Sequence, residues 1–260
     1  MLHLTPDNYY SAEANRAYMC ASQVKSFMRC PAATMAELRG EYSRPVTSAL
    51  LIGSYVDAYF EGTLDAFRAE HPELYRRDGL LKAEYQHAEV MIDRAKRDPV
   101  FMDYMRGDKQ RIITGDIDGV PFKAKMDVYL PGERIVDLKT VRDFDPKYKP
   151  GSGLVSFVEY WGYDLQMAIY QMLEGHTLPT YIAAITKEPS PDIAVISIPQ
   201  HYMDAAMAVL RENLQYYDAI KNGLIEPPRC GHCEYCKATK VLTGAQPIED
   251  FEINEEDEIL

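Results

Sequence analysis

The sequence predicts an α/β protein in which one mixed β-sheet is flanked by helices and preceded by a helical N-terminal part. Over roughly the first hundred residues, apolar side chains recur at the spacing of amphipathic helices. From residue 108 onward they alternate with polar side chains, which is typical of strands with one buried face. A helical segment then separates three strands from two more, and this order favours a mixed sheet over an all-helical or all-strand fold.

Three helical segments precede the strands. The first, "SQVKSFMRCPAATMAELRG", is expected to begin at Ser22 as its N-cap and to break at Cys30-Pro31, because proline disrupts a helix interior. In the second, "VTSALLIGSYVDAYFEG", Asp57 and Glu61 lie one turn apart on one face. The third, "KAEYQHAEVMIDRAKRDPVFMDYMRG", is a longer amphipathic and charged stretch.

Three consecutive antiparallel strands are predicted in "KQRIITGDIDGVPFKAKMDVYLPGERIVDLKT", because turn signals stand at Asp118-Gly119 and Pro131-Gly132. A loop rich in Asp, Lys, Pro and Gly leads into the helix "VSFVEYWGYDLQMAIYQML". Two further strands, "PTYIAAITKE" and "DIAVISIPQ", are followed by a helix over about 201–222.

We interpret residues 1–245 as a single domain, because 260 residues are enough to bury one substantial core. Its parts are a helical N-terminal part (about 1–106), a core (about 107–222) and a cysteine-rich segment (228–240). Residues 246–260 form an acidic tail with seven acidic residues and no basic ones, which we expect to be solvated and partly disordered.

Charge and hydropathy make several classes of protein less expected. The net charge of −12 lowers the expectation of nucleic-acid binding without excluding it, since much of that charge lies in the tail. The N-terminus lacks the basic start and apolar run of a signal peptide, and no apolar stretch approaches the ~18 residues needed to span a bilayer. We therefore expect a cytoplasmic protein with no membrane partner.

Two carboxylates and a lysine gather on two neighbouring predicted strands. Asp127 lies on the same face of its strand as Lys125, and Asp137 and Lys139 share a face of the next strand. If the turn is a three-residue loop centred on Gly132, the aspartates become cross-strand neighbours with Cβ atoms about 4.5–5.5 Å apart. Such a pair requires a cation, for which Mg²⁺ is suited, and Lys139 could orient a water for attack on a phosphodiester. Surface pairing of the aspartates with neighbouring lysines is the simpler alternative.

The series Asp127, nine residues, then Asp137-Leu138-Lys139 resembles the signature of PD-(D/E)xK nucleases, with Met126 in place of the proline of the motif. The resemblance implies a restriction-endonuclease-like fold and hydrolysis of phosphodiesters with one or two metal ions.

Two helices add to this resemblance. The helix "GYDLQMAIYQ" resembles the Gln-x-x-x-Tyr motif of the RecB-like branch, here Gln166 and Tyr170, although a tyrosine-rich helix can also simply pack in a core. In the Gly-x-x-x-His motif of that branch the histidine is a metal ligand, and "GSYVDAYFEG" has Asp57 in its place. A carboxylate can also bind Mg²⁺ or Mn²⁺. Glu61, one turn further on, either adds to the site or is solvated.

Residues 8 to 243 as a whole are similar to the phage and prophage exonucleases related to the nuclease domain of RecE. This similarity implies metal ligands, namely Asp57, Asp127, Asp137 and the backbone carbonyl of Leu138. It also implies catalytic residues, namely Asp127, Asp137, a water-activating Lys139, and a substrate-holding pair, Gln166 and Tyr170.

Cys230, Cys233 and Cys236 follow one another at spacings of three in "RCGHCEYCK". In a cytosolic protein this pattern indicates metal binding rather than disulfides, and it suits three corners of a [4Fe–4S] cluster. Some RecB-like nucleases have one cysteine before the core and three after it, and Cys30 stands where that early cysteine would be. The alternatives are zinc held by the three cysteines with His232 or Cys30, Cys20 as the fourth ligand, and metal-free thiols.

The sequence therefore favours an Mg²⁺-dependent exodeoxyribonuclease that resects double-stranded DNA ends in phage-type recombination. One alternative is an iron–sulfur nuclease that processes single strands or cuts internally. Another is a non-catalytic module that binds DNA ends or a partner. The expected partners are double-stranded DNA ends and a single-strand annealing protein, which the acidic tail could bind, and a homo-oligomer is a further option.

Overall fold

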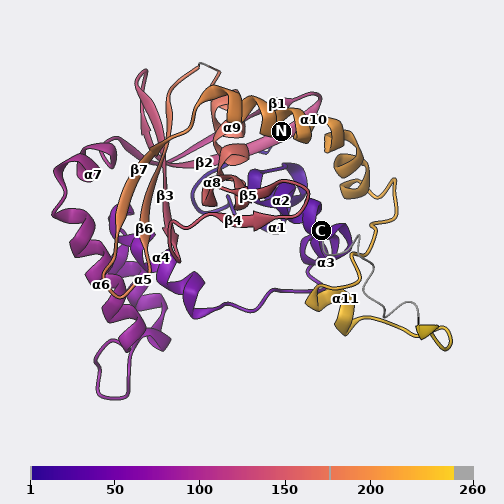
Figure 1. Cartoon of the computed structure of the whole chain (residues 1–260), viewed down its shortest axis with the longest axis horizontal. Coiled ribbons are helices and arrows are strands. Elements are labelled where there is room, and N and C mark those ends of the chain that lie inside the picture. Colours follow the sequence, from indigo (N-terminus) through magenta and orange to yellow (C-terminus); the bar gives the residue numbers. More distant parts are fainter. Residues whose placement is uncertain (1, 176, 249–260) are drawn as a thin grey trace.

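The computed structural model describes residues 2–175 and 177–248, so residues 249–260 of the acidic tail lie outside the described part (Figure 1). Its main sheet has five strands in the order β1-β2-β3-β6-β7, and β4 and β5 form a separate hairpin. β3 and β6 are parallel and the other neighbours in the main sheet are antiparallel, which confirms the predicted mixed sheet. The strands are β1 (Asp108–Ile117), β2 (Val120–Leu130), β3 (Arg134–Val141), β4 (Lys147–Lys149), β5 (Gly153–Val155), β6 (Thr180–Thr186) and β7 (Ile193–Ser197).

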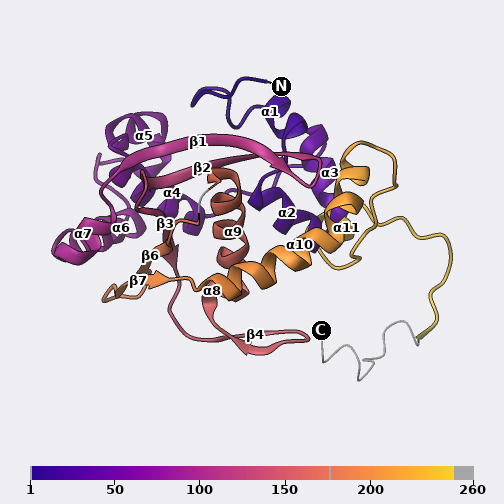
Figure 2. The same ribbon diagram turned by 90° about the horizontal axis from the view of Figure 1, so that it is seen from above.

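The helices are α1 (Ala12–Ala17), α2 (Ala21–Arg29), α3 (Pro31–Arg39), α4 (Ser48–Glu61), α5 (Leu64–Glu70), the short 3₁₀ helix η1 (Pro72–Leu74), α6 (Ala83–Lys96), α7 (Pro99–Tyr104), α8 (Phe157–Tyr160), α9 (Tyr163–Glu174), α10 (Gln200–Lys221) and α11 (Glu234–Ala238). Figure 2 shows α4 to α7 at one end of the molecule and α1 to α3 with α11 at the other, with α9 between them. No helix of the described part is long and apolar enough to cross a membrane.

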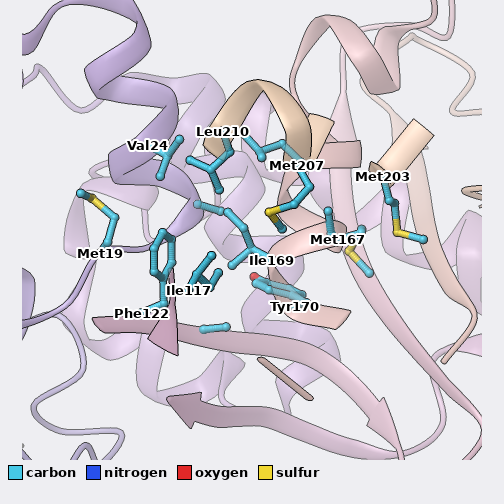
Figure 3. Close-up of a cluster of buried hydrophobic side chains, with 14 of the residues drawn as sticks. Met19, Val24, Ile117, Phe122, Met167, Ile169, Tyr170, Met203, Met207 and Leu210 are labelled. Atoms are coloured by element: carbon cyan, nitrogen blue, oxygen red, sulfur yellow. The ribbon is translucent and has the colours of Figure 1, made fainter. Parts of the chain in front are cut away.

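Each face of the sheet supports its own hydrophobic core. Along β6 the residues alternate between the two: Ile182 and Ala184 pack with α9 and α10, whereas Ala183 and Ile185 pack with α4 and α6. Figure 3 shows part of the first core, where side chains of α9 and α10 pack against β1 and β2. Because both faces are covered, the central strands are apolar along most of their length, and any charged side chain among them requires a specific partner.

β2 and β3 pair in the register that a three-residue loop predicts. The loop is centred on Gly132, whose φ of 73° lies in the left-handed region that favours glycine. Val128 lies opposite Val136. Continued by one residue, this register places Asp127 opposite Asp137, as the sequence predicted.

Three local features differ from the sequence-based predictions. Ser22 is not the N-cap of α2, because the helix begins one residue earlier and Cys20 is the cap residue. The third predicted helix is divided into α6 and α7, because Asp98 caps a new helix that starts at Pro99. The third difference begins in the predicted loop over 142–153, where β4 and β5 form a hairpin that ends at Val155. The helix predicted to follow it is divided into α8 and α9, because Gly162 between them has a φ of 63°, in the left-handed region.

Candidate active site

β3 brings Asp137 and Lys139 to the face of the sheet that α9 covers. They alternate with the side chains of the opposite face and share the face of Ile135, which packs in the core with α9. The Asp137 carboxylate forms an ion pair with the Lys139 ammonium, and Lys139 Nζ also donates to the Leu138 carbonyl oxygen at 3.3 Å. Asp137 is 1% exposed, so its charge is balanced inside the protein rather than by water.

The Asp127 carboxylate of β2 lies next to Asp137 and accepts hydrogen bonds from two N–H donors. The backbone N–H of Leu138 donates to Asp127 Oδ2 at 2.9 Å, and Gln110 Nε2 donates to Oδ1 at 3.2 Å. The bond from Leu138 ties the aspartate of β2 directly to β3 beside Asp137. The structure therefore brings the predicted acidic pair together.

α4 contributes Asp57, and a glycine allows the helix to come close enough. A Cβ at Gly53 would lie 3.2 Å from Thr140 Oγ1 of β3, tighter than nearly all real contacts of that kind. Asp57 follows one turn later and Glu61 another turn on, so both project from the same face of α4. Both side chains line the cavity that also contains Asp127.

α9 contributes Gln166 and Tyr170, which are hydrogen-bonded to both strands. Gln166 Nε2 donates to Asp137 Oδ1 at 2.8 Å and to Tyr170 Oη at 2.9 Å. The Tyr170 hydroxyl donates to the Lys125 carbonyl oxygen at 3.0 Å. On the other side, Lys25 Nζ of α2 donates to Gln166 Oε1 at 3.4 Å. Since the ammonium can only donate, Lys25 orients the amide so that its N–H groups face Asp137.

Most of these side chains line one cavity of about 780 Å³. The predicted site residues among its walls are Asp57, Asp127, Asp137, Lys139, Gln166 and Tyr170. The other walls contain basic, hydroxyl and aromatic side chains, namely Tyr9, Tyr10, Arg16, Ser22, Ser26, Arg39 and Arg44, together with Glu37, which pairs with Arg44. We call the part lined by the carboxylates of α4, β2 and β3 the acidic end, and the part lined by the arginines of and near α1 and α3 the cationic end.

The acidic end opposes ionisation of its own carboxylates. Burial, aided by the charge of Asp137, raises the pKa of Asp127 well above its ordinary value. Burial also raises the pKa of Asp57 to about 7, although the Lys139 ammonium opposes this shift. Burial by itself would lower the pKa of Lys139, but the neighbouring carboxylates, Asp137 first, outweigh it and raise that pKa. In the protein alone, Lys139 is therefore the cation that balances the carboxylates.

The donor set fits Mg²⁺ or Mn²⁺. Three carboxylates and the Leu138 carbonyl are hard oxygen ligands. Burial, aided by the charge of Asp137, raises the pKa values of Asp57 and Asp127, and a bound cation would favour the ionised form of both. Within residues 2–175 and 177–248, these carboxylate oxygens do not all lie within 4.8 Å of one another. An ion that binds all three carboxylates directly therefore requires their oxygens to come closer together.

Sequence reasoning missed Gln110, the residue of β1 that bonds to Asp127. Its φ of 53° is uncommon for a residue other than glycine, and such a backbone costs about 1–3 kcal/mol. Its Oε1 is buried and has no hydrogen-bond partner in the described part of the chain. Strain and an unsatisfied buried oxygen together are typical of functional sites. Neither can be seen in a sequence, since glutamine in a strand is ordinary.

The four cysteines of the predicted metal site come together away from the carboxylates. Their sulfurs all lie within 4.8 Å of one another, with Cys236 Sγ 3.6 Å from Cys30 Sγ and 3.9 Å from Cys230 Sγ. Cys30 joins α2 to α3, while Cys233 caps α11, so the group ties the N-terminal helices to the C-terminal segment. Neither Cys20 nor His232 belongs to this set of ligand atoms.

The cysteine group is prepared to bind metal. The backbone N–H groups of Ala33, Cys233 and Cys236 donate to the sulfurs of Cys30, Cys230 and Cys233, respectively. Burial opposes ionisation of Cys230, yet the N–H donors of Cys233 and His232 lower its pKa to about 6. Thiolates rather than thiols are the metal ligands, so Cys230 is already in the binding form at neutral pH. Burial raises the pKa of Cys233 to about 12, so a metal ion must displace the proton of that thiol.

Residues 20–239 match the model of a family described as "PDDEXK-like domain of unknown function (DUF3799)". The chain belongs to this family. The match includes all of the site residues above, from Cys30 to Cys236. The PD-(D/E)xK resemblance in the sequence is thereby confirmed.

A solved relative agrees with this assignment. A protein described as a "Putative exonuclease" from Eubacterium rectale, known from a crystal structure, is 42% identical in sequence to this PDDEXK-like chain. The alignment covers 96% of this chain and 98% of the relative, and the two structures superimpose with a TM-score of 0.93. The crystal structure of SSO0001 is 11% identical, covers 83% of this chain with 91% of its own length, and superimposes with a TM-score of only 0.31. The curated proteins contain no match.

Metal affinity of the PDDEXK-like domain should depend steeply on pH. With a pKa of about 7, Asp57 holds a proton below neutrality that a cation must displace. Mn²⁺ affinity, measured by calorimetry, should therefore fall by up to about tenfold per pH unit below pH 7. Asp57→Asn should bind more weakly at pH 8 and show a flatter pH dependence. An equally steep dependence in that variant would remove Asp57 from the site.

The raised pKa of Asp57 also determines whether the metal-free protein becomes more or less stable as pH rises. Between the ordinary aspartate pKa of about 4 and the folded value, the folded protein holds a proton that the unfolded chain releases. The contribution of Asp57 to the free energy of unfolding therefore falls as pH rises through this window.

Proposed function

We propose that this PDDEXK-like domain is a metal-dependent deoxyribonuclease that digests linear double-stranded DNA from its ends, in recombination of the phage type. The observation that carries the proposal is the meeting of Asp127, Asp137 and Lys139 in one cavity with Gln166 and Tyr170. The 42% identity to a chain described as an exonuclease supports it. A single-strand annealing protein is the partner that such a role requires, because resection produces single strands.

The proposed reaction is hydrolysis of a phosphodiester, in which water attacks phosphorus and an ester P–O bond breaks. One or two Mg²⁺ ions held by Asp57, Asp127, Asp137 and the Leu138 carbonyl would polarise the phosphate and lower the pKa of the water. Lys139, beside Asp137, is placed to orient that water. Gln166 keeps Asp137 in position through its amide N–H, and Tyr170 fixes Gln166 relative to β2.

Digestion of linear and covalently closed duplex DNA, with Mg²⁺ or with EDTA, tests the proposal. Loss of the linear substrate alone, dependent on metal and abolished by Asp137→Ala, is the expected result. Asp65→Ala is the matched control, because Asp65 is exposed in the first turn of α5. Cutting of closed circles would establish an endonuclease instead, and no cleavage of either DNA by folded protein would indicate a binding module.

Lys139→Ala should fold and bind metal but lose cleavage by about 10²-fold or more, because it removes the group that orients water. Single-turnover cleavage rates, with Mn²⁺ binding measured in parallel, provide the test. An unchanged rate would exclude the lysine from the mechanism.

Lys25→Met should slow cleavage about three- to tenfold while leaving the melting temperature nearly unchanged, because the Gln166 amide is then free to turn over. Lys25→Arg, which restores a donor, should recover most of the rate. The expected signature is a fall in kcat with little change in KM. If both variants cleave like the wild type, Lys25 does not position Gln166.

We further infer that the four cysteines hold a single Zn²⁺, although their spacing in the sequence favoured a [4Fe–4S] cluster. With Zn–S bonds of about 2.3 Å, a tetrahedral ion holds its sulfurs about 3.8 Å apart. The sulfur–sulfur distances of 3.6 and 3.9 Å are close to this value. A four-iron cluster binds each thiolate through a different iron and therefore keeps the thiolates farther apart.

A further inference from the structure

A turn near the N-terminus presents an aromatic side chain at the cavity wall. Tyr10 is 68% exposed and lines the cavity together with Tyr9, against whose ring it packs edge to face at 5.0 Å between centroids. Single exposed tyrosines are common on protein surfaces and need no explanation. Tyr10 differs because a buried lysine, Lys123, fixes the backbone of the turn that contains it.

A buried lysine holds the turn in place. Lys123 of β2 is 1% exposed, and its Nζ donates to the Tyr9 carbonyl oxygen and, at 2.8 Å, to Asn15 Oδ1. Asn15 Nδ2 donates in turn to the Tyr10 carbonyl oxygen at 3.2 Å. The consecutive carbonyls of Tyr9 and Tyr10 are therefore both fixed by side chains. Burying an ammonium costs several kcal/mol before its contacts are counted, so the position of this turn is specified closely.

Lys123, which holds the turn, and Asp127 of the acidic site lie on the same face of β2. Lys123, Lys125 and Asp127 alternate with buried apolar residues along β2, and two residues of a strand span about 6.7 Å. The Lys125 ammonium lies over the Tyr10 ring, 4.7 Å from its centroid. The lysine that contacts the ring is therefore the neighbour of Asp127 on this face of β2, and Tyr10 and Asp127 line the same cavity.

We propose that Tyr10 forms a nucleobase subsite, on which a base near the scissile phosphate stacks. The Lys125 ammonium lies over the ring, so the base would stack on the opposite face while Lys125 attracts the DNA backbone. Stacking of a base on an aromatic ring is independent of sequence, as a nuclease of general specificity requires. This inference rests on the proposed action on DNA and adds to it the group that holds the base.

The test removes the ring and the base separately. The wild type, Tyr10→Ala, Tyr10→Phe and the control Tyr216→Ala, an exposed tyrosine of α10 outside the cavity, are compared on linear duplexes. Each duplex carries one abasic nucleotide at the first, second, third or fourth position from the strand end, or none. KM and kcat are measured with Mg²⁺.

On intact DNA, Tyr10→Ala should raise KM about tenfold, while Tyr10→Phe and Tyr216→Ala stay near the wild type. At one abasic position the wild type should lose the same factor, and Tyr10→Ala should lose nothing more. If the losses multiply at every position, or if Tyr10→Ala cuts intact DNA like the wild type, the subsite is overturned while the nuclease stands. A wild type that cuts none of the duplexes overturns the proposed function and the subsite together.

Discussion

Asp127→Asn should abolish DNA cleavage yet leave the metal-free protein at least as stable as the wild type. Burial and the charge of Asp137 raise the pKa of Asp127, so its negative charge is unfavourable in the fold without a cation. Asparagine keeps the shape and removes that charge. Its Oδ1 can still accept from the Leu138 N–H, as Asp127 Oδ2 does now.

The second contact of this side chain can also be kept in the variant. If the Gln110 amide turns over, its Oε1, buried without a partner in the described structure, accepts from the new Asn Nδ2. Thermal unfolding in EDTA should therefore show an equal or higher melting temperature. With Mn²⁺ the wild type should gain stability through binding and the variant much less.

Cleavage by Asp127→Asn should fall by about 10²–10³-fold or more, the loss typical of removing one preorganised electrostatic group. Asp65→Asn, an exposed substitution on α5, is the control for the general effect of losing a carboxylate. Full cleavage would show that Asp127 holds no essential ion. A lower melting temperature in EDTA would show that the carboxylate is structural and favourable without metal.

The predictions from sequence succeeded where the determining interactions are local. Alternation along β3 is enough to place Asp137 and Lys139 on one face, and the turn at Gly132 is enough to bring Asp127 beside them. Helical periodicity likewise placed Gln166 and Tyr170 on one side of α9, where they contact each other. Each inference needed only a repeat of two or 3.6 residues.

What sequence reasoning missed depends on contacts between distant segments. Lys25 and Gln166 are 141 residues apart in the chain, so no local pattern links them. Alternation places Lys123 on the same face of β2 as Lys125 and Asp127, but this lysine is buried because the segment containing Tyr9 folds over it. Gln110 is distinguished by its backbone conformation, which tertiary contacts impose.

Loss of the cysteine site should have the largest effect on stability. Cys236→Ser removes a ligand that is 2% exposed, and the remaining sulfurs then cannot complete a four-coordinate site. Structural zinc sites in small domains contribute about 10–16 kcal/mol of binding free energy, of which only a part is lost here because a large core remains. A loss of about 3–5 kcal/mol would lower the melting temperature by about 10 °C.

Cys20→Ser is the matched control, because Cys20 is a thiol that lies outside the metal-ligand set. Metal analysis of the wild type should give one zinc per chain without iron or sulfide, and Cys236→Ser should contain less than a stoichiometric amount. Iron and acid-labile sulfide with a visible absorption band would instead establish the [4Fe–4S] cluster. Equal melting temperatures for Cys236→Ser and Cys20→Ser would show that no metal holds this end of the molecule together.

Cys236→Ser should also affect the two ends of the cavity differently. Cys30 joins α2 and α3, and side chains of both helices, including Ser26 and Arg39, line the cationic end, whereas the acidic end is built on α4, β2 and β3. Below its melting temperature, Cys236→Ser should therefore show a higher KM for DNA with kcat and Mn²⁺ affinity much less affected. A fall in Mn²⁺ affinity comparable with that of Asp127→Asn would mean instead that the cysteine group supports the carboxylates, which it does not contact in the described structure.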